Sequence, residues 1–182
     1  MKKETPPFYI LTGGPGSGKT SVLEELKKIG FSVVLESGRK LIQEQVNCDS
    51  DALPWKDKKK FRDLLLNCDM EKYKECLLEK NPIFFDRGIP DSIGYSYLES
   101  LPVSNSLLRK IKDYPYQKTV FIFPPWEEIY VNDAERKQSF QKAVATYETI
   151  KETYQNLGYT VIEIKKTSIK ERVQMILLNL VD

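Results

Sequence analysis

The amino-acid sequence contains no histidine among its 182 residues and only three cysteines, Cys48, Cys68 and Cys76. Without histidine the chain has no Ser-His or Cys-His catalytic pair, no HExxH zinc site and no imidazole base that titrates near neutral pH. The cysteines form no Cys-x-x-Cys pair, so free thiols in a reducing compartment are expected rather than a disulfide framework or a zinc ribbon. Acid–base chemistry therefore falls to carboxylates, lysine, tyrosine or cysteine.

Long apolar segments are also missing. No apolar run approaches the roughly 18–20 residues that a membrane-spanning helix needs. The N-terminal residues Met1 to Pro7 are charged and lack the apolar stretch of a secretion signal, which predicts a cytoplasmic protein without a membrane partner. The 28 basic and 26 acidic residues leave a formal net charge of +2, so no global field draws the chain onto nucleic acid. Partners are therefore expected at local sites.

The apolar residues recur with the alternation expected for strands and helices. A chain of this length has the size of one globular domain, and neither a linker nor a repeat interrupts residues 1–182. Strands are predicted at residues 8–12, 31–35, 82–85, 118–123 and 159–164. Helices are predicted at about 19–28, 37–46, 55–80, 90–98, 104–112 and 140–157, and along the stripe from Ile169 to Leu180. This order predicts a five-stranded parallel sheet covered on both faces, a three-layer α/β/α fold.

The most specific motif is a glycine-rich loop between the first predicted strand and the first predicted helix. It reads Gly13-Gly14-Pro15-Gly16-Ser17-Gly18-Lys19-Thr20 and fits the pattern G-x-x-x-x-G-K-[ST]. Such a loop curls so that successive backbone N–H groups point at phosphates, at the positive end of the following helix. Lys19 is expected to reach the β- and γ-phosphates of ATP, and the Thr20 hydroxyl to ligate Mg²⁺. The alternative, a glycine-rich turn with a chance lysine, does not explain the flanking strand and helix.

A carboxylate follows the third predicted strand. Asp86 comes directly after Ile83-Phe84-Phe85, beside the glycine-rich loop in a parallel sheet, where it would hold Mg²⁺ directly or through water. Hydrolytic P-loop ATPases resemble one another in usually placing a glutamate next to this aspartate. This chain has Arg87 there, a residue suited to holding a phosphate. The alternative is an Asp-Arg-Gly turn with a surface ion pair.

A second carboxylate ends the second predicted strand. Strand ends in an open parallel sheet point into the ligand crevice, so Glu36 is expected opposite the γ-phosphate, where it would accept the proton of an attacking hydroxyl. Arg39, one helical turn further on, is expected to hold an anionic substrate group. The alternative for Glu36 is a helix N-terminal charge that interacts with the dipole.

Charged residues gather before the helix predicted at 140–157. The segment Asn132-Asp133-Ala134-Glu135-Arg136-Lys137-Gln138 predicts a mobile lid at about 126–139. Arg136 or Lys137 on this lid would stabilise the transferring phosphoryl group, with Lys142 as a weaker candidate. An ordinary helix start capped by Asp133 or Asn132 is the alternative.

Two other patterns are less specific. Trp126, Tyr130, Tyr95 and Tyr97 are candidates for stacking on a base or shaping an acceptor pocket, although such aromatics more often pack in a core. Asp91-Ser92-Ile93-Gly94 fits the D-x-x-G pattern of GTP-binding switches. It falls inside a predicted helix, however, and no N-K-x-D motif accompanies it, so the match is interpreted as accidental.

Taken in chain order, these pieces resemble the nucleoside and nucleotide kinases among the P-loop proteins. The resemblance covers nearly the whole chain and rests on the Gly13–Thr20 loop, Val34-Leu35-Glu36, Phe85-Asp86-Arg87 and the Arg136 region. In deoxynucleoside kinases a glutamate after the second strand serves as base, an acid–Arg pair follows the third strand, and an arginine-bearing lid closes over ATP. The resemblance implies these roles for Glu36, for Asp86 with Arg87, and for Arg136, and it implies a P-loop fold with kinase-like strand order.

The chain also resembles bacterial AAA-type proteins grouped with the ribosylnicotinamide kinase domain, many of which are known only as predicted ATPases. The lid departs from the deoxynucleoside kinase pattern of R-x-x-x-R, because Arg136 is the only arginine between Arg109 and Arg172. Lys137 and Lys142 would have to share its task.

The sequence therefore predicts an ATP- and Mg²⁺-dependent phosphotransferase that acts on a small hydroxyl- or phosphate-bearing acceptor, nucleoside- or nucleotide-like. In this hypothesis Lys19, Glu36, Asp86, Arg87 and Arg136 are catalytic, Thr20 and Asp86 bind the metal, and the acceptor contacts are Glu36, Arg39 and Arg87. One alternative is a regulatory switch or slow ATPase or GTPase, in which bound nucleotide orders residues 126–139. A nucleic-acid end kinase is a weaker alternative, because the chain has no basic run.

Overall fold

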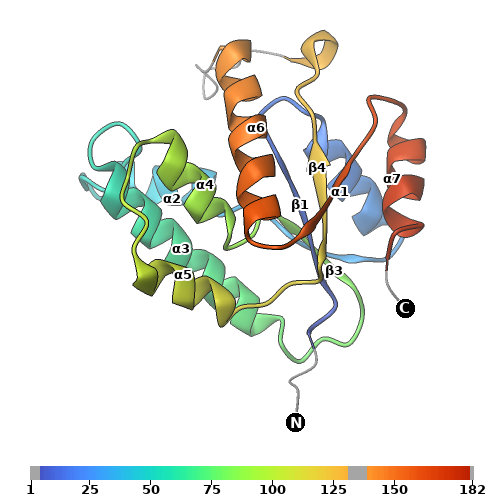
Figure 1. Cartoon of the computed structure of the whole chain (residues 1–182), viewed down its shortest axis with the longest axis horizontal. Coiled ribbons are helices and arrows are strands. Elements are labelled where there is room, and N and C mark those ends of the chain that lie inside the picture. Colours follow the sequence, from blue (N-terminus) through green and yellow to red (C-terminus); the bar gives the residue numbers. More distant parts are fainter. Residues whose placement is uncertain (1–4, 131–138, 181–182) are drawn as a thin grey trace.

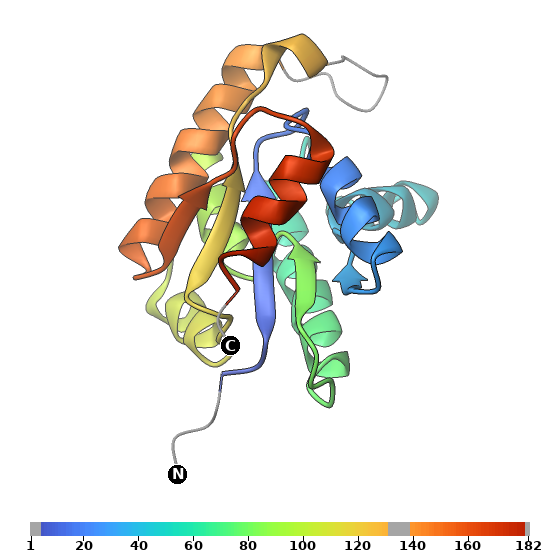
Figure 2. The ribbon, with the colours of Figure 1, turned by 90° about the vertical axis from the view of Figure 1, so that its right-hand side faces the viewer.

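Five parallel strands form one sheet at the centre of the computed structural model, which describes residues 5–130 and 139–180. The strands are β1 (Phe8–Gly13), β2 (Ser32–Val34), β3 (Ile83–Asp86), β4 (Thr119–Phe123) and β5 (Thr160–Glu163). Their order across the sheet is β2-β3-β1-β4-β5, and every neighbouring pair is parallel (Figures 1 and 2). The predicted parallel sheet is confirmed, with the strand that precedes the glycine-rich loop at its centre.

The alternation of side chains along β1 explains the layers on the two faces of the sheet. Tyr9 and Leu11 face one way and pack with helices α1 (Lys19–Lys28) and α7 (Ile169–Leu177). Phe8 and Ile10 face the other way, toward α3 (Lys58–Glu75), α4 (Asp91–Leu98), α5 (Asn105–Lys112) and α6 (Phe140–Asn156). Because both faces are covered, the central strands carry apolar side chains on both faces over most of their length, as expected for buried parallel strands (Figures 1 and 2).

Most elements differ from their predicted bounds by a residue or more, and hydrogen bonds account for two of the differences. The helix predicted at 55–80 is shorter, because the Asp57 side chain caps its first turn by accepting a hydrogen bond from the Lys60 amide at 2.9 Å. Of the face predicted to be buried, Phe61 and Tyr73 are buried but Leu77 lies beyond the helix and is 47% exposed. The second strand has three residues instead of five, because the Phe31 amide closes the end of α1 on the Leu26 carbonyl.

Two further elements complete the described chain. Helix α2 (Gly38–Asn47) follows β2, and a 3-10 turn, η1 (Glu127–Ile129), follows β4 and its two prolines. In the parts of the chain that the structure describes, no helix combines the length and the apolar character required to cross a bilayer.

Candidate active site

The carboxyl ends of three neighbouring strands bring most of the sequence-predicted site residues to one edge of the sheet. In the register of the sheet Leu11 of β1 is opposite Asp86 of β3, and Val34 of β2 is opposite Phe85. The glycine-rich loop continues from β1, and Glu36 follows β2 by two residues. The loop, Glu36 and the Asp86-Arg87 pair therefore lie at adjacent strand ends, as expected for a ligand crevice in a parallel sheet.

The glycine-rich loop has little room for side chains. The Ser17 hydroxyl donates to the Gly14 carbonyl at 3.0 Å, across the turn. Gly16 has a left-handed φ of 70°, and a Cβ there would collide with the ring of Tyr130. Both the backbone conformation and this close approach require glycine. The loop thus turns through a conformation that leaves its backbone as the main surface for a ligand.

Lys19 and Asp86 form an ion pair at the loop. The ammonium group of Lys19 contacts Asp86 Oδ1, and the two side chains are only 8% and 10% exposed. Thr20, the next residue of α1, is exposed to solvent. Among the described residues, Thr20 and Asp86 form no hydrogen bond with each other. The structure therefore brings Lys19 and Asp86 together but leaves the predicted Thr20–Asp86 metal pair as a prediction.

Arg87 is held between two carboxylates. Its backbone adopts a left-handed φ of 68°, unusual for a residue with a side chain, and its amide donates to the Leu11 carbonyl at 2.9 Å. The guanidinium then donates to Glu36 Oε2 at 3.4 Å through Nε and to Asp91 Oδ1 at 3.3 Å through Nη1. Burial disfavours its charge, but Glu36, Asp91 and Asp86 outweigh burial and raise the pKa of Arg87. The left-handed backbone at Arg87 thus places its guanidinium between Glu36 and Asp91.

Glu36 is half-buried, lies two residues before α2 begins at Gly38, and contacts the Arg87 guanidinium. Burial raises the pKa of its carboxyl group, but Arg87, Lys19 and Arg39 together outweigh burial and hold the pKa below its ordinary value. Glu36 is therefore ionised at neutral pH. Arg39, which was predicted to bind the phosphoryl acceptor, is exposed on α2, and its charge lies close enough to lower the pKa of Glu36.

Asp91 is a site residue that the sequence analysis missed. Its buried carboxylate accepts from the Thr12 hydroxyl at 2.6 Å, the Tyr154 hydroxyl at 2.5 Å and the Gly88 amide at 2.9 Å, in addition to Arg87. The D-x-x-G match had drawn attention to this aspartate for a different chemistry. Its actual contacts join the end of β1, the turn after β3 and helix α6.

With this geometry established, the comparisons with known proteins can be interpreted. A family model described as an AAA domain matches residues 8–172. The chain belongs to this AAA-domain family. None of the curated proteins compared with the chain matches it.

Solved structures share the fold of this AAA-domain protein. A deoxyadenosine kinase from M. mycoides with the products dCMP and dCDP aligns with a TM-score of 0.66 at 14% identity, covering 95% of this chain and 98% of the kinase. The same kinase with bound dATP gives a TM-score of 0.54 at 14% identity and the same coverage. The YorR protein from Bacillus subtilis, in complex with phosphorylated GDP, gives 0.58 at 15% identity, with 94% of each chain covered. At these identities the likeness shows the fold alone, and this is the kinase-like P-loop fold that the sequence resemblance implied.

A second missed carboxylate in this AAA-domain protein lies next to Glu36. Asp69 of α3 accepts a hydrogen bond from the Ser37 hydroxyl at 2.6 Å. Burial raises its pKa to about 6 and outweighs the Ser37 hydrogen bond and the charge of Lys72, which both lower it, while the nearby charges of Asp91 and Glu36 add smaller contributions that raise it. No sequence signal distinguished Asp69 from the other charged residues of its helix, because its position depends on how α3 packs against the strand ends.

The predicted lid is only partly within the described residues. Arg136 and Lys137 lie outside them, as do the proposed caps Asn132 and Asp133. Lys142 is exposed on α6, with its Nζ 3.7 Å from a carboxylate oxygen of Glu99. On either side of the segment 131–138, Tyr130 and Phe140 meet edge to face with ring centroids 5.5 Å apart.

The aromatic residues proposed for base stacking have separate surroundings. The ring of Trp126 lies against the guanidinium of Arg172, whose Cζ is 5.5 Å from the ring centroid. Tyr95 contacts Phe61, with ring centroids 5.9 Å apart, and Tyr97 is 55% exposed. Of these four residues, Tyr130 lies against the glycine-rich loop at Gly16, and Trp126 is connected to it through Arg172, which donates to the Ser17 carbonyl.

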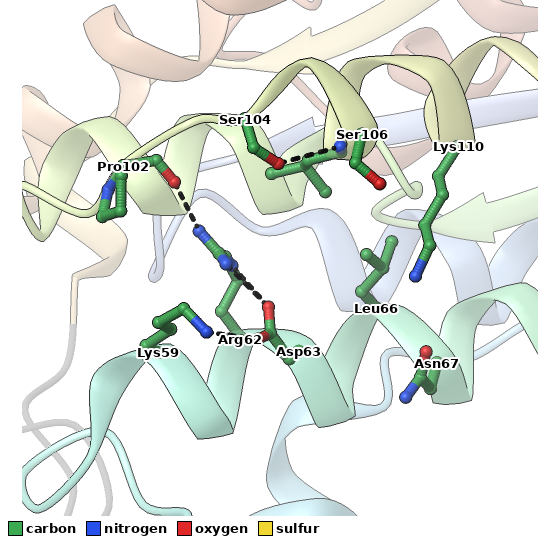
Figure 3. A pocket seen from close by; sticks show the side chains of 10 residues that line it. Lys59, Arg62, Asp63, Leu66, Asn67, Pro102, Ser104, Ser106 and Lys110 are labelled. Carbon is green, nitrogen blue, oxygen red and sulfur yellow. Dashed lines mark hydrogen bonds and ion pairs between the residues drawn. The ribbon is translucent and has the colours of Figure 1, made fainter.

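A cavity of about 300 Å³ lies away from these residues, between α3 and α5 (Figure 3). The guanidinium of Arg62 spans it, donating to the Pro102 carbonyl at 3.0 Å and to Asp63 at 2.7 Å. None of the sequence-predicted site residues lines this cavity. The candidate active site is therefore the cluster of charged side chains and the glycine-rich loop at the strand ends.

Proposed function

We propose that this protein is an ATP- and Mg²⁺-dependent phosphotransferase that acts on a small, nucleoside- or nucleotide-like acceptor. The observation that carries this proposal is the contact between Glu36 and Arg87 beside the Lys19–Asp86 ion pair. A base for an acceptor hydroxyl and a cation for a phosphate are thereby adjacent, next to a loop suited to phosphate binding. Hydrolytic P-loop ATPases usually place a water-activating glutamate directly next to the aspartate, whereas this chain has Arg87 after Asp86.

The triphosphate is bound by the loop from Gly13 to Thr20. The phosphates would take the place of Asp86 as the partner of Lys19, which would leave the Asp86 carboxylate free to hold Mg²⁺. The described residues contain no cluster of three or more His, Cys, Asp or Glu side chains able to hold a metal. The few oxygen donors fit Mg²⁺ that arrives with the nucleotide, because this ion is usually held by one or two protein oxygens together with phosphates and water. Thr20 and Asp86 would be those ligands.

Glu36 acts as the base in this proposal. Its lowered pKa keeps it ionised at neutral pH, ready to accept a proton, although the same cations make it a weaker base. Arg87 stays charged and divides its hydrogen bonds between Glu36 and Asp91, so part of its guanidinium can turn to the transferring phosphate or to a phosphate on the acceptor. Arg39 and the predicted lid residue Arg136 add further positive charge.

The acceptor class is supported by the nucleotides bound to the structural neighbours and by the side chains around Glu36. The neighbours were solved with dATP, with dCMP and dCDP, and with phosphorylated GDP. Beside Glu36 in this chain, Asp69 presents a second carboxylate that is bonded to Ser37. A nucleoside-like acceptor has hydroxyl and amino donors for both carboxylates.

The proposal is tested by screening nucleosides, nucleotides, vitamins and sugars for acceptor-dependent consumption of ATP. Lys19→Ala is expected to lower nucleotide affinity and turnover sharply, because it removes the cation that contacts the phosphates. Glu36→Gln is expected to abolish transfer while ATP binding is retained, and Glu44→Gln, an exposed carboxylate on α2, is the matched control. Slow hydrolysis that no acceptor accelerates would instead favour a switch or an ATPase.

A further inference from the structure

Helix α7 places a buried arginine behind the glycine-rich loop. Arg172 is 2% exposed, and its guanidinium donates to the Ser17 carbonyl at 2.7 Å through Nη2 and to the Gly18 carbonyl at 3.3 Å through Nη1. The same group packs against Phe123, 4.8 Å from the ring centroid, and against Trp126. One side chain thus connects α7, the end of β4 and the phosphate-binding loop.

The positive charge of Arg172 has no carboxylate partner among residues 5–130 and 139–180. Its Nε is buried without a hydrogen-bond partner, and burial lowers its pKa. Buried cations are normally paired, because removing a charge from water is costly. Peptide carbonyls and aromatic faces offset part of that cost here. An anion bound on the other side of the loop would offset more of it.

The peptide planes of the loop link Arg172 to that anion. In a trans peptide the C=O and the following N–H point in opposite directions. A guanidinium that holds the Ser17 and Gly18 carbonyls on the α7 side therefore directs the Gly18 and Lys19 N–H groups to the other side. A cation on the carbonyls also polarises these peptides and makes their N–H groups stronger donors.

We propose that Arg172 is a positioning residue for phosphate binding, which orients the Gly18 and Lys19 amides toward the phosphate chain of the nucleotide. Gly18 supports this interpretation, since its left-handed φ is 73° and a Cβ would come within 2.7 Å of Arg172 Nη1. The backbone of the loop at Gly18 thus packs directly against the Arg172 guanidinium. The inference rests on the proposed function only in so far as the loop binds nucleotide, and it needs no acceptor.

The test is calorimetric titration with ADP and with inorganic tripolyphosphate, each with Mg²⁺. Arg172→Met should weaken binding of both ligands by the same factor, about tenfold or more, because both depend on the oriented amides. Arg172→Lys, which keeps the charge but not the two-pronged geometry, should have intermediate affinity. Val173→Ala removes buried volume from the same helix without loop contact and should stay within about twofold of the wild type.

The possible results separate the proposals. Affinity of Arg172→Lys equal to wild type, a loss confined to ADP, or an equal loss in Val173→Ala would each overturn the role of Arg172. If the wild type binds neither ligand, the proposed function fails together with this inference. If Arg172→Met loses affinity as expected but no acceptor stimulates ATP consumption, the role of Arg172 stands and the kinase proposal fails.

Discussion

Asp69 gives the most quantitative prediction, because its carboxylate is buried beside Glu36 at a cost to stability. Its pKa is raised from the ordinary 3.8 to about 6, mainly by burial. An acid with a raised folded-state pKa binds its proton more tightly in the folded state, so its deprotonation destabilises the fold. This cost is absent near pH 4, develops as the pH rises to about 6 and is complete above it. At about 1.4 kcal/mol for each pKa unit, it reaches at most about 3 kcal/mol at pH 7.5.

Asp69→Asn removes the titrating group and keeps a carbonyl oxygen for the Ser37 hydroxyl. The variant is therefore expected to have a higher free energy of unfolding in urea at pH 7.5, by up to about 3 kcal/mol, with the gain disappearing near pH 4. Glu71→Gln, an exposed substitution on the same helix, is the control and should change stability by less than about 0.5 kcal/mol at either pH. No gain at pH 7.5, or an equal gain at both pH values, would refute the reasoning.

Two further substitutions probe buried hydrogen bonds, one at the cavity between α3 and α5 and one at Asp91. Arg62→Met removes a buried guanidinium that binds Ser96, the Pro102 carbonyl and Asp63, and it should lower the free energy of unfolding by about 2–4 kcal/mol in urea. A loss below about 1 kcal/mol would show that these bonds contribute little. Tyr154→Phe deletes the 2.5 Å hydrogen bond to Asp91 and should cost about 1–3 kcal/mol in the same assay. An unchanged midpoint would mean that Asp91 is adequately satisfied by its other donors.

The parts of the fold that follow from local pattern could be predicted from the sequence. Five short apolar runs became five strands, and the glycine-rich motif lies between β1 and α1 as its spacing requires. The same reasoning brought Glu36 and Asp86 to adjacent strand ends, because parallel strands expose their carboxyl ends at one edge. Helix ends were harder to predict. Asp57 competes with the residues before it for the start of α3, and a periodic pattern does not record that competition.

The missed residues depend on packing between distant segments. Asp91 lies five positions after Asp86, but its partners Thr12 and Tyr154 are 79 and 63 residues away in the chain. Arg172 had the pattern of an ordinary charged position on a terminal helix, and its burial follows from α7 packing beside α1 and the loop. A local sequence pattern contains no information on contacts between residues that are far apart in the chain. In this chain it found the groups proposed for the chemistry and missed those that hold them in place.

The central claim is that Glu36 serves transfer to an acceptor rather than the fold or nucleotide binding. The most direct measurement compares ATP consumption by the wild type and by Glu36→Gln, with and without the acceptor found by the screen, alongside calorimetric ATP affinity. The account predicts strong stimulation of the wild type by the acceptor, no stimulation of the variant, and equal ATP affinity. Acceptor-dependent turnover that survives in Glu36→Gln, or ATP affinity that is lost together with turnover, would contradict it.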